Sequence, residues 1–196
     1  MMNLGGCGAA TACDCCIDLD EAFGTHLYPF GREHMTQADY IAFSNRMKPY
    51  LHPRANGIDT LELFMEGFNA YLRDAGATEI ALSPLPGSLP YAAAREALIR
   101  QIDLGLPVPY LNLLHHNPVF EDYEWHWFVL NGYDQQGETL RAKAATYGRG
   151  EWLDFRELWE SGHEKKGGMV LLALQERAAQ RPERVLSPQR LEAVRV

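Results

Sequence analysis

Cysteine is absent from most of the chain. All four cysteines (Cys7, Cys13, Cys15 and Cys16) lie near the start of a sequence of 196 residues. A disulfide framework needs partners spread along the chain, so this distribution excludes one. It indicates reduced thiols and favours a reducing compartment such as the cytoplasm, while leaving the compartment itself open.

Long apolar runs and an excess of positive charge are also missing. No stretch approaches the roughly 20 apolar residues that cross a membrane, and the N-terminus lacks the basic and apolar segments of a signal peptide. The 18 basic and 26 acidic residues give a net charge of −8. This charge argues against nucleic acid or an anionic membrane surface as a partner. We expect no cofactor, and the oligomeric state is open.

The composition is that of a folded protein with one domain of ordinary size. Hydrophobic residues make up 46% of the chain and charged residues 22%, which is enough apolar content to build a core. We place the domain at residues 1–176. Residues 177–196 are polar, rich in Arg and Glu and interrupted by proline, and we expect them to form a peripheral tail.

Helical patterns dominate the first half of the sequence. Small residues after Cys7 predict a buried helix to Phe23. Thr36 with Asp39 resembles a capping box, and Asp59 or Thr60 is expected to cap a third helix that Gly76 ends. The predicted helices cover residues 7–23, 36–50, 60–75 and 91–102, with a short strand at 78–82 and a loop at 83–87.

Period-two patterns and apolar runs follow in the second half. They predict strands at residues 106–114, 125–133, 139–146 and 168–174, a loop at 115–122 and a short helix at 153–159. Helices that precede an antiparallel sheet predict an α+β fold with segregated layers.

Two residues carry the candidate chemistry. Cys7 opens the first helix, where the helix dipole and unpaired N–H groups favour a thiolate. His126 lies near the start of an apolar strand, Trp125-His126-Trp127-Phe128-Val129-Leu130-Asn131-Gly132-Tyr133-Asp134. One nitrogen of an imidazole can be held while the other faces a partner. We expect that partner to be Cys7.

The order of two motifs resembles the papain-like cysteine peptidase superfamily. These are Cys7-Gly8-Ala9-Ala10-Thr11-Ala12 and the strand that begins at His126. The similarity is greatest to bacterial bacteriocin-leader peptidases and their stand-alone relatives, and it spans roughly residues 3 to 174.

The resemblance implies a papain-like fold, with a central helix opened by Cys7 and an antiparallel sheet that carries His126. It further implies a peptidase or amidase that works through an acyl-enzyme thioester on a peptide or another amide or acyl substrate. Cys7 matches the nucleophile and His126 the general base. Asn3 is the nearest counterpart of the family's oxyanion Gln and would act with the Cys7 N–H.

The residue that orients the imidazole in the family is missing from its expected strand. The family has Asn or Asp there, whereas this chain has Ala145. We consider Asp134, Asn131 and Thr146 as substitutes, with Asp134 as the working candidate. The absence also favours an alternative hypothesis, a papain-fold binding protein without turnover.

A weaker alternative is metal binding by the cysteine cluster. Cys13 and Cys16 form a Cys-x-x-Cys pair, and His26 and His34 are available as further ligands. The second closely spaced pair of a typical zinc site is missing. The competing interpretation is that Cys7, Cys13, Cys15 and Cys16 are simply residues of a buried helix.

Overall fold

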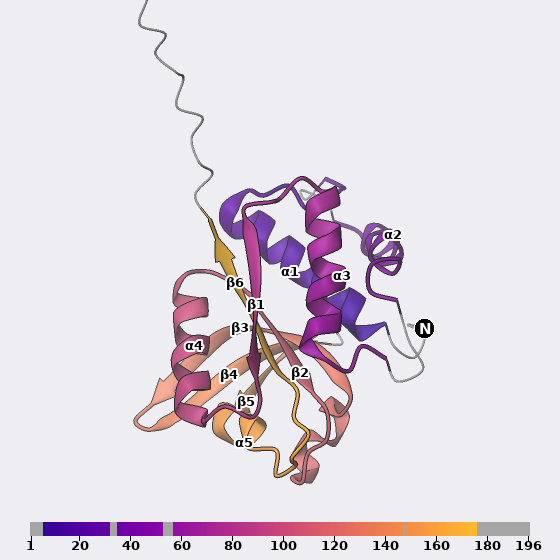
Figure 1. Cartoon of the computed structure of the whole chain (residues 1–196). Coiled ribbons are helices and arrows are strands. Elements are labelled where there is room, and N and C mark those ends of the chain that lie inside the picture. Colours follow the sequence, from indigo (N-terminus) through magenta and orange to yellow (C-terminus); the bar gives the residue numbers. More distant parts are fainter. Residues whose placement is uncertain (1–5, 32–34, 53–56, 147, 176–196) are drawn as a thin grey trace, which may run out of the picture.

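A computed structural model describes residues 6–31, 35–52, 57–146 and 148–175 (Figure 1). It has helices in its first half and six antiparallel strands, so the predicted α+β class is confirmed. The four longer helices are α1 (Cys7–Phe23), α2 (Gln37–Met47), α3 (Leu61–Asp74) and α4 (Tyr91–Asp103).

Local sequence sets the ends of these helices. The Thr36 hydroxyl accepts a hydrogen bond from the Asp39 N–H, and the Asp39 carboxylate accepts one from the Thr36 N–H, which completes the predicted capping box of α2. Thr60 caps α3 by accepting from the Leu63 N–H. Gly76 follows α3 with φ +76°, a conformation that glycine adopts without strain.

The sheet has the strand order β1-β6-β2-β3-β4-β5, and all five pairs of neighbouring strands are antiparallel. A short helix α5 (Phe155–Trp159) and a 3-10 turn η1 (Pro118–Tyr123) connect strands at one end. The strands are β1 (Ile80–Pro86), β2 (Val108–Asn112), β3 (His126–Gln136), β4 (Thr139–Thr146), β5 (Arg149–Asp154) and β6 (Gly168–Leu174).

Helices cover both faces of the sheet. In Figure 1, α1, α2 and α3 gather on one side and α4 and α5 on the other. Alternating side chains of β3 pack into the cores on the two sides of the sheet, because successive side chains of a strand point to opposite faces. Trp127 and Val129 belong to the core under α1 and α3, whereas Phe128 and Leu130 belong to the core under α4 and α5.

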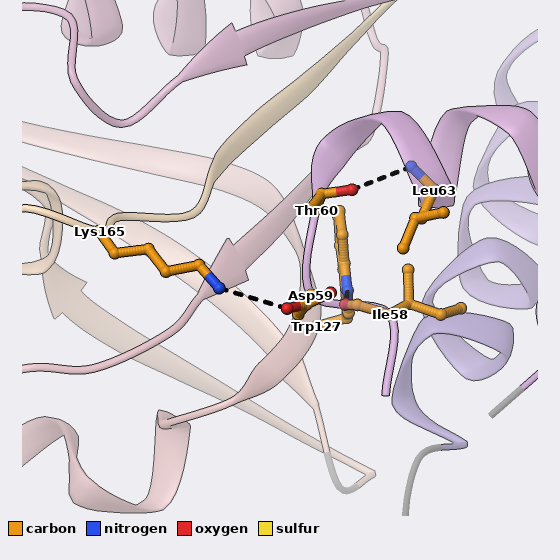
Figure 2. A network of polar contacts seen from close by, with 6 residues as sticks. All are labelled: Ile58, Asp59, Thr60, Leu63, Trp127 and Lys165. Atoms are coloured by element: carbon orange, nitrogen blue, oxygen red, sulfur yellow. Dashed lines mark hydrogen bonds and ion pairs between the residues drawn. The ribbon is translucent and has the colours of Figure 1, made fainter. Parts of the chain in front are cut away.

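The segment before α3 ties the helical layer to the sheet. The Trp127 Nε1–H donates to the Ile58 carbonyl at 2.6 Å, and Asp59 pairs with Lys165 at 3.2 Å (Figure 2). Ile58 also packs on α1. A Cβ atom built on Gly8 would lie 2.9 Å from the Ile58 Cδ1. The absence of a side chain at Gly8 therefore allows Ile58 to pack this closely against α1. These contacts fix the N-terminal end of α1 beside β3.

Several predicted boundaries were wrong: α2 ends at Met47 rather than near Tyr50, β3 continues to Gln136, and strand β5 was not predicted. Residues 83–86 were expected in a loop, but β1 continues to Pro86; its two prolines are tolerated because β1 is an edge strand that pairs only with β6. Residues 153–154 were expected in a helix, but they end strand β5, and Asp154 then caps α5 by accepting from the Glu157 N–H.

Within the described part of the chain, none of the helices has the length and apolar character needed to cross a membrane. The predicted tail at 177–196 lies outside the described residues.

Candidate active site

A cleft with a volume of about 630 Å³ lies alongside α1, and strands β3, β4 and β5 form its other wall. Cys7 and His126 both line it, so the structure brings the two main sequence candidates to one cavity. The remaining lining residues are Ala10, Thr11, Asp14, Ile17, Asp18, Tyr40, Trp127, Val129, Asn131, Lys143, Ala145, Thr146, Gly148, Arg149 and Gly150.

Cys7 is the first residue of α1 and is partly exposed. The first helical hydrogen bond at this end runs from the Ala10 N–H to the Gly6 carbonyl. The N–H groups at the very start of an α-helix have no acceptor inside the helix. The thiol of Cys7 is therefore next to backbone donors that can stabilise negative charge on a bound group.

His126 is the first residue of β3 and only 7% of its surface is exposed. Its backbone is held by pairing with Asn112 of β2. The His126 Nε2 lies 2.6 Å from the Thr146 Oγ1 at the end of β4. Burial lowers the pKa of His126 to about 4. The imidazole is therefore neutral near pH 7, which is the form that accepts a proton.

An acidic wall continues along α1 beyond Cys7. The Tyr40 hydroxyl donates to the Asp14 carboxylate at 2.7 Å, and burial raises the pKa of Asp14 to about 6. Burial also raises the pKa of Asp18, while a hydrogen bond from Asn131 acts in the opposite direction. Sequence reasoning missed both acids. The signal was their spacing, because residues 7, 11, 14 and 18 share one helical face.

Asp134 does not lie near His126. It is eight residues further along β3, which is about 26 Å for an extended strand, and it pairs with Arg141 at 2.9 Å. The motif suggested Asp134, but the direction of β3 places this residue far from the imidazole of His126. Asn131 bonds to Asp18 instead, whereas Thr146 contacts His126. Asn3 lies outside the described residues.

The cysteine cluster is part of the core. Cys13, Cys15 and Cys16 are fully buried, and burial raises the pKa of all three thiols. A protonated thiol is a poor zinc ligand. Among the residues that the structure describes, no three or more His, Cys, Asp or Glu side chains gather as a metal site. The weaker metal hypothesis therefore lacks a site within that part; His34 lies outside it.

Comparisons with protein-family models, with curated proteins and with solved structures find no match for this chain.

Proposed function

We propose that this protein is a papain-like thiol hydrolase, a peptidase or amidase, with Cys7 as the nucleophile and His126 as the general base. The observation that carries the proposal is that both residues line one cleft, Cys7 as the first residue of α1 and His126 as the first residue of β3. The order of these elements, a central helix followed by a sheet, supports the papain-like comparison.

The residues fit a two-step acyl transfer. The Cys7 Sγ attacks the carbonyl carbon while His126 takes the thiol proton. Backbone N–H groups at the start of α1 stabilise the oxyanion. The C–N bond then breaks, His126 gives its proton to the leaving amine, and a thioester remains on Cys7. Water attacks the thioester, His126 takes a proton from it, and the acid product leaves with the thiol restored.

The low pKa of His126 indicates how the proton moves. A resting thiolate–imidazolium pair needs an imidazole that stays protonated near neutral pH, whereas burial keeps His126 neutral there. The proposed mechanism therefore begins from neutral His126, and proton transfer accompanies the attack of sulfur. We therefore expect the reactivity of the Cys7 thiol to depend on His126 at every pH in the neutral range.

The test combines an acyl donor with mass spectrometry. p-Nitrophenyl acetate should give a burst of nitrophenol and an acetyl group on the peptide that contains Cys7. The Cys7→Ala variant should lose the adduct. In parallel, the rate of iodoacetamide modification of Cys7 at pH 6 to 8 should fall at least tenfold in His126→Ala, which corresponds to 1.4 kcal/mol of barrier.

His163→Ala is the matched control, because His163 lies in the loop before β6 and packs edge-on against His116 rather than lining the cleft. It should react like the wild type. Equal iodoacetamide rates in the wild type and in His126→Ala at every pH would contradict the proposal. They would support the alternative of a papain-fold binding protein without turnover.

A further inference from the structure

We propose that the cleft binds a short peptide with free ends, whose carboxylate pairs with Lys143 on the sheet and whose ammonium group faces Asp14 and Asp18 on α1. All three residues line the cleft. As the substrate class of the hydrolase, this inference rests on the proposed function and deepens it. As a statement about binding it is tested separately, because binding needs no turnover.

Lys143 of β4 points to the face of the sheet on which α1 lies. Its neighbours Ala142 and Ala144 belong to the core under α4 and α5, and successive side chains of a strand alternate between faces. Arg149, the other cation on the cleft, pairs with Thr146 and so points to the opposite face. Within the described part of the chain, no side chain forms an ion pair with the Lys143 ammonium group. This group is available to a carboxylate of a ligand.

Two glycines make room for the Lys143 side chain on the floor of the cleft. Gly132 of β3 pairs with Lys143, and a Cβ atom built on Gly132 would lie 3.2 Å from the Lys143 Cβ. A Cβ atom on Gly150 of β5 would lie 3.0 Å from the Lys143 Cε and 3.9 Å from its Nζ. Neither glycine has a positive φ, so the backbone does not require glycine at either position. The missing side chains let Lys143 extend along the sheet toward Gly150, which also lines the cleft.

The wall formed by α1 has two carboxylates without a cationic partner. Asp14 accepts a hydrogen bond from the Tyr40 hydroxyl, and Asp18 accepts one from Asn131, so both partners are neutral. Among the described residues, neither carboxylate forms an ion pair. Burial raises the pKa of both groups, because no nearby positive charge offsets the loss of water. An ammonium group from a ligand would supply that charge.

The opposite charges of the two walls decide between classes of ligand. A purely anionic ligand would face Asp14 and Asp18, and a purely cationic one would face Lys143. Apolar residues separate the charged ones along the cleft, namely Ala10, Ile17, Val129 and Ala145. The volume of about 630 Å³ is that of a pocket for a small ligand. A short peptide with apolar side chains and two charged ends matches these features together.

The test is isothermal titration calorimetry with trialanine and the Cys7→Ala protein, which measures binding without turnover. Trialanine should bind. N-acetyl-trialanine lacks the ammonium group and trialanine amide lacks the carboxylate, and each should bind at least tenfold more weakly, as expected for one lost hydrogen bond between charged groups. Equal affinities for the three peptides, or no binding of trialanine at millimolar concentration, would overturn the inference.

Substitutions in the same Cys7→Ala background assign each end of the peptide. Lys143→Met keeps the length of the side chain and should weaken trialanine at least tenfold, while the affinity for trialanine amide stays the same. Asp14→Asn combined with Asp18→Asn should weaken trialanine and leave N-acetyl-trialanine unchanged. Lys48→Met is the control, because Lys48 bonds to a residue of α2 and does not line the cleft. An equal loss for all three peptides in Lys143→Met would contradict its pairing with the carboxylate.

Gly150→Val tests the room that the glycines provide. It alters no charge, but it should weaken trialanine several-fold, because the added methyl groups displace the end of the Lys143 side chain. Gly31→Val is its control, since open space surrounds Gly31. Unchanged affinity in Gly150→Val would overturn the position assigned to Lys143.

The inference and the proposed function fail in different ways. Acylation of Cys7 by p-nitrophenyl acetate without binding of trialanine would leave the hydrolase in place and overturn the ligand. Binding of trialanine that depends on Lys143, without acylation of Cys7, would leave the binding site in place and overturn the hydrolase. The second result is the one expected of a binding protein without turnover.

Discussion

His126 and Asp14 line the same cleft, and burial shifts their pKa values in opposite directions. The pKa of His126 is lowered from 6.5 to about 4, and that of Asp14 is raised from 3.8 to about 6. Between pH 4 and pH 6, unfolding adds a proton at His126 and releases one at Asp14. By linkage, His126 makes stability rise with pH and Asp14 makes it fall, so the two contributions oppose each other.

Single substitutions should separate these contributions. From pH 4 to pH 6, Asp14→Asn should gain stability relative to the wild type, and His126→Gln should lose it, each by roughly 3 kcal/mol. Urea unfolding at several pH values measures the difference. Asp122→Asn, at an exposed position in η1, should keep the slope of the wild type. Parallel curves for all four proteins would contradict the assigned pKa shifts.

At the scale of elements, α1 is held against the segment before α3 by the close approach of Gly8 and Ile58. A Cβ at residue 8 meets the far end of the flexible Ile58 side chain, so Gly8→Ala should be tolerated. Gly8→Val should lower the free energy of unfolding by about 1–3 kcal/mol, because the extra methyl groups overpack the contact.

Adding Ile58→Ala to Gly8→Val should recover part of that loss, since it removes the atoms in the way. Gly31→Val is the control, because open space surrounds Gly31. Chemical denaturation measures the free energy of unfolding of each variant and of the wild type. A Gly8→Val protein as stable as the wild type would show that α1 does not need this close approach.

The same scale explains what the sequence predicts well and what it does not. Thr36 and Thr60 were recognisable as caps because the chemistry is local to a few residues. The extent of β1 was not, because Pro84 is acceptable only in a strand whose far edge is unpaired, and edge position depends on the whole sheet.

For the candidate site, too, some features were predictable from the sequence and others were not. Cys7 and His126 were identifiable from motifs, and the cleft that contains both was not. The contact between His126 and Thr146 depends on the register of β3 and β4, which includes an irregularity between Leu130 and Gly132. A register of this kind is set by pairing and packing along both strands, so the choice among Asp134, Asn131 and Thr146 needed the structure.

At the scale of the whole molecule, β3 joins the two cores, with Val129 in one and Leu130 in the other. We expect a single cooperative unfolding transition. Variants that keep only Trp127 or only Trp159 report on the two cores separately by fluorescence, and their urea midpoints should coincide.

Val129→Ala and Leu130→Ala should each lower both midpoints together, by about 1–5 kcal/mol in free energy of unfolding. Replacement of exposed Val119 by Ala is the control and should leave the midpoints in place. Two separate midpoints in any of these proteins would contradict the prediction of one domain.

The positions of the four cysteines also determine how the protein would respond to oxidation. Cys7 is partly exposed, whereas Cys13, Cys15 and Cys16 are buried in α1. Cys13 follows Cys7 by six residues, about 9 Å along a helix, which is too far for a disulfide. A sulfenic acid formed at Cys7 would thus have no resolving cysteine within its own chain. Its reduction would depend on a thiol from outside, such as a small-molecule thiol that can enter the cleft.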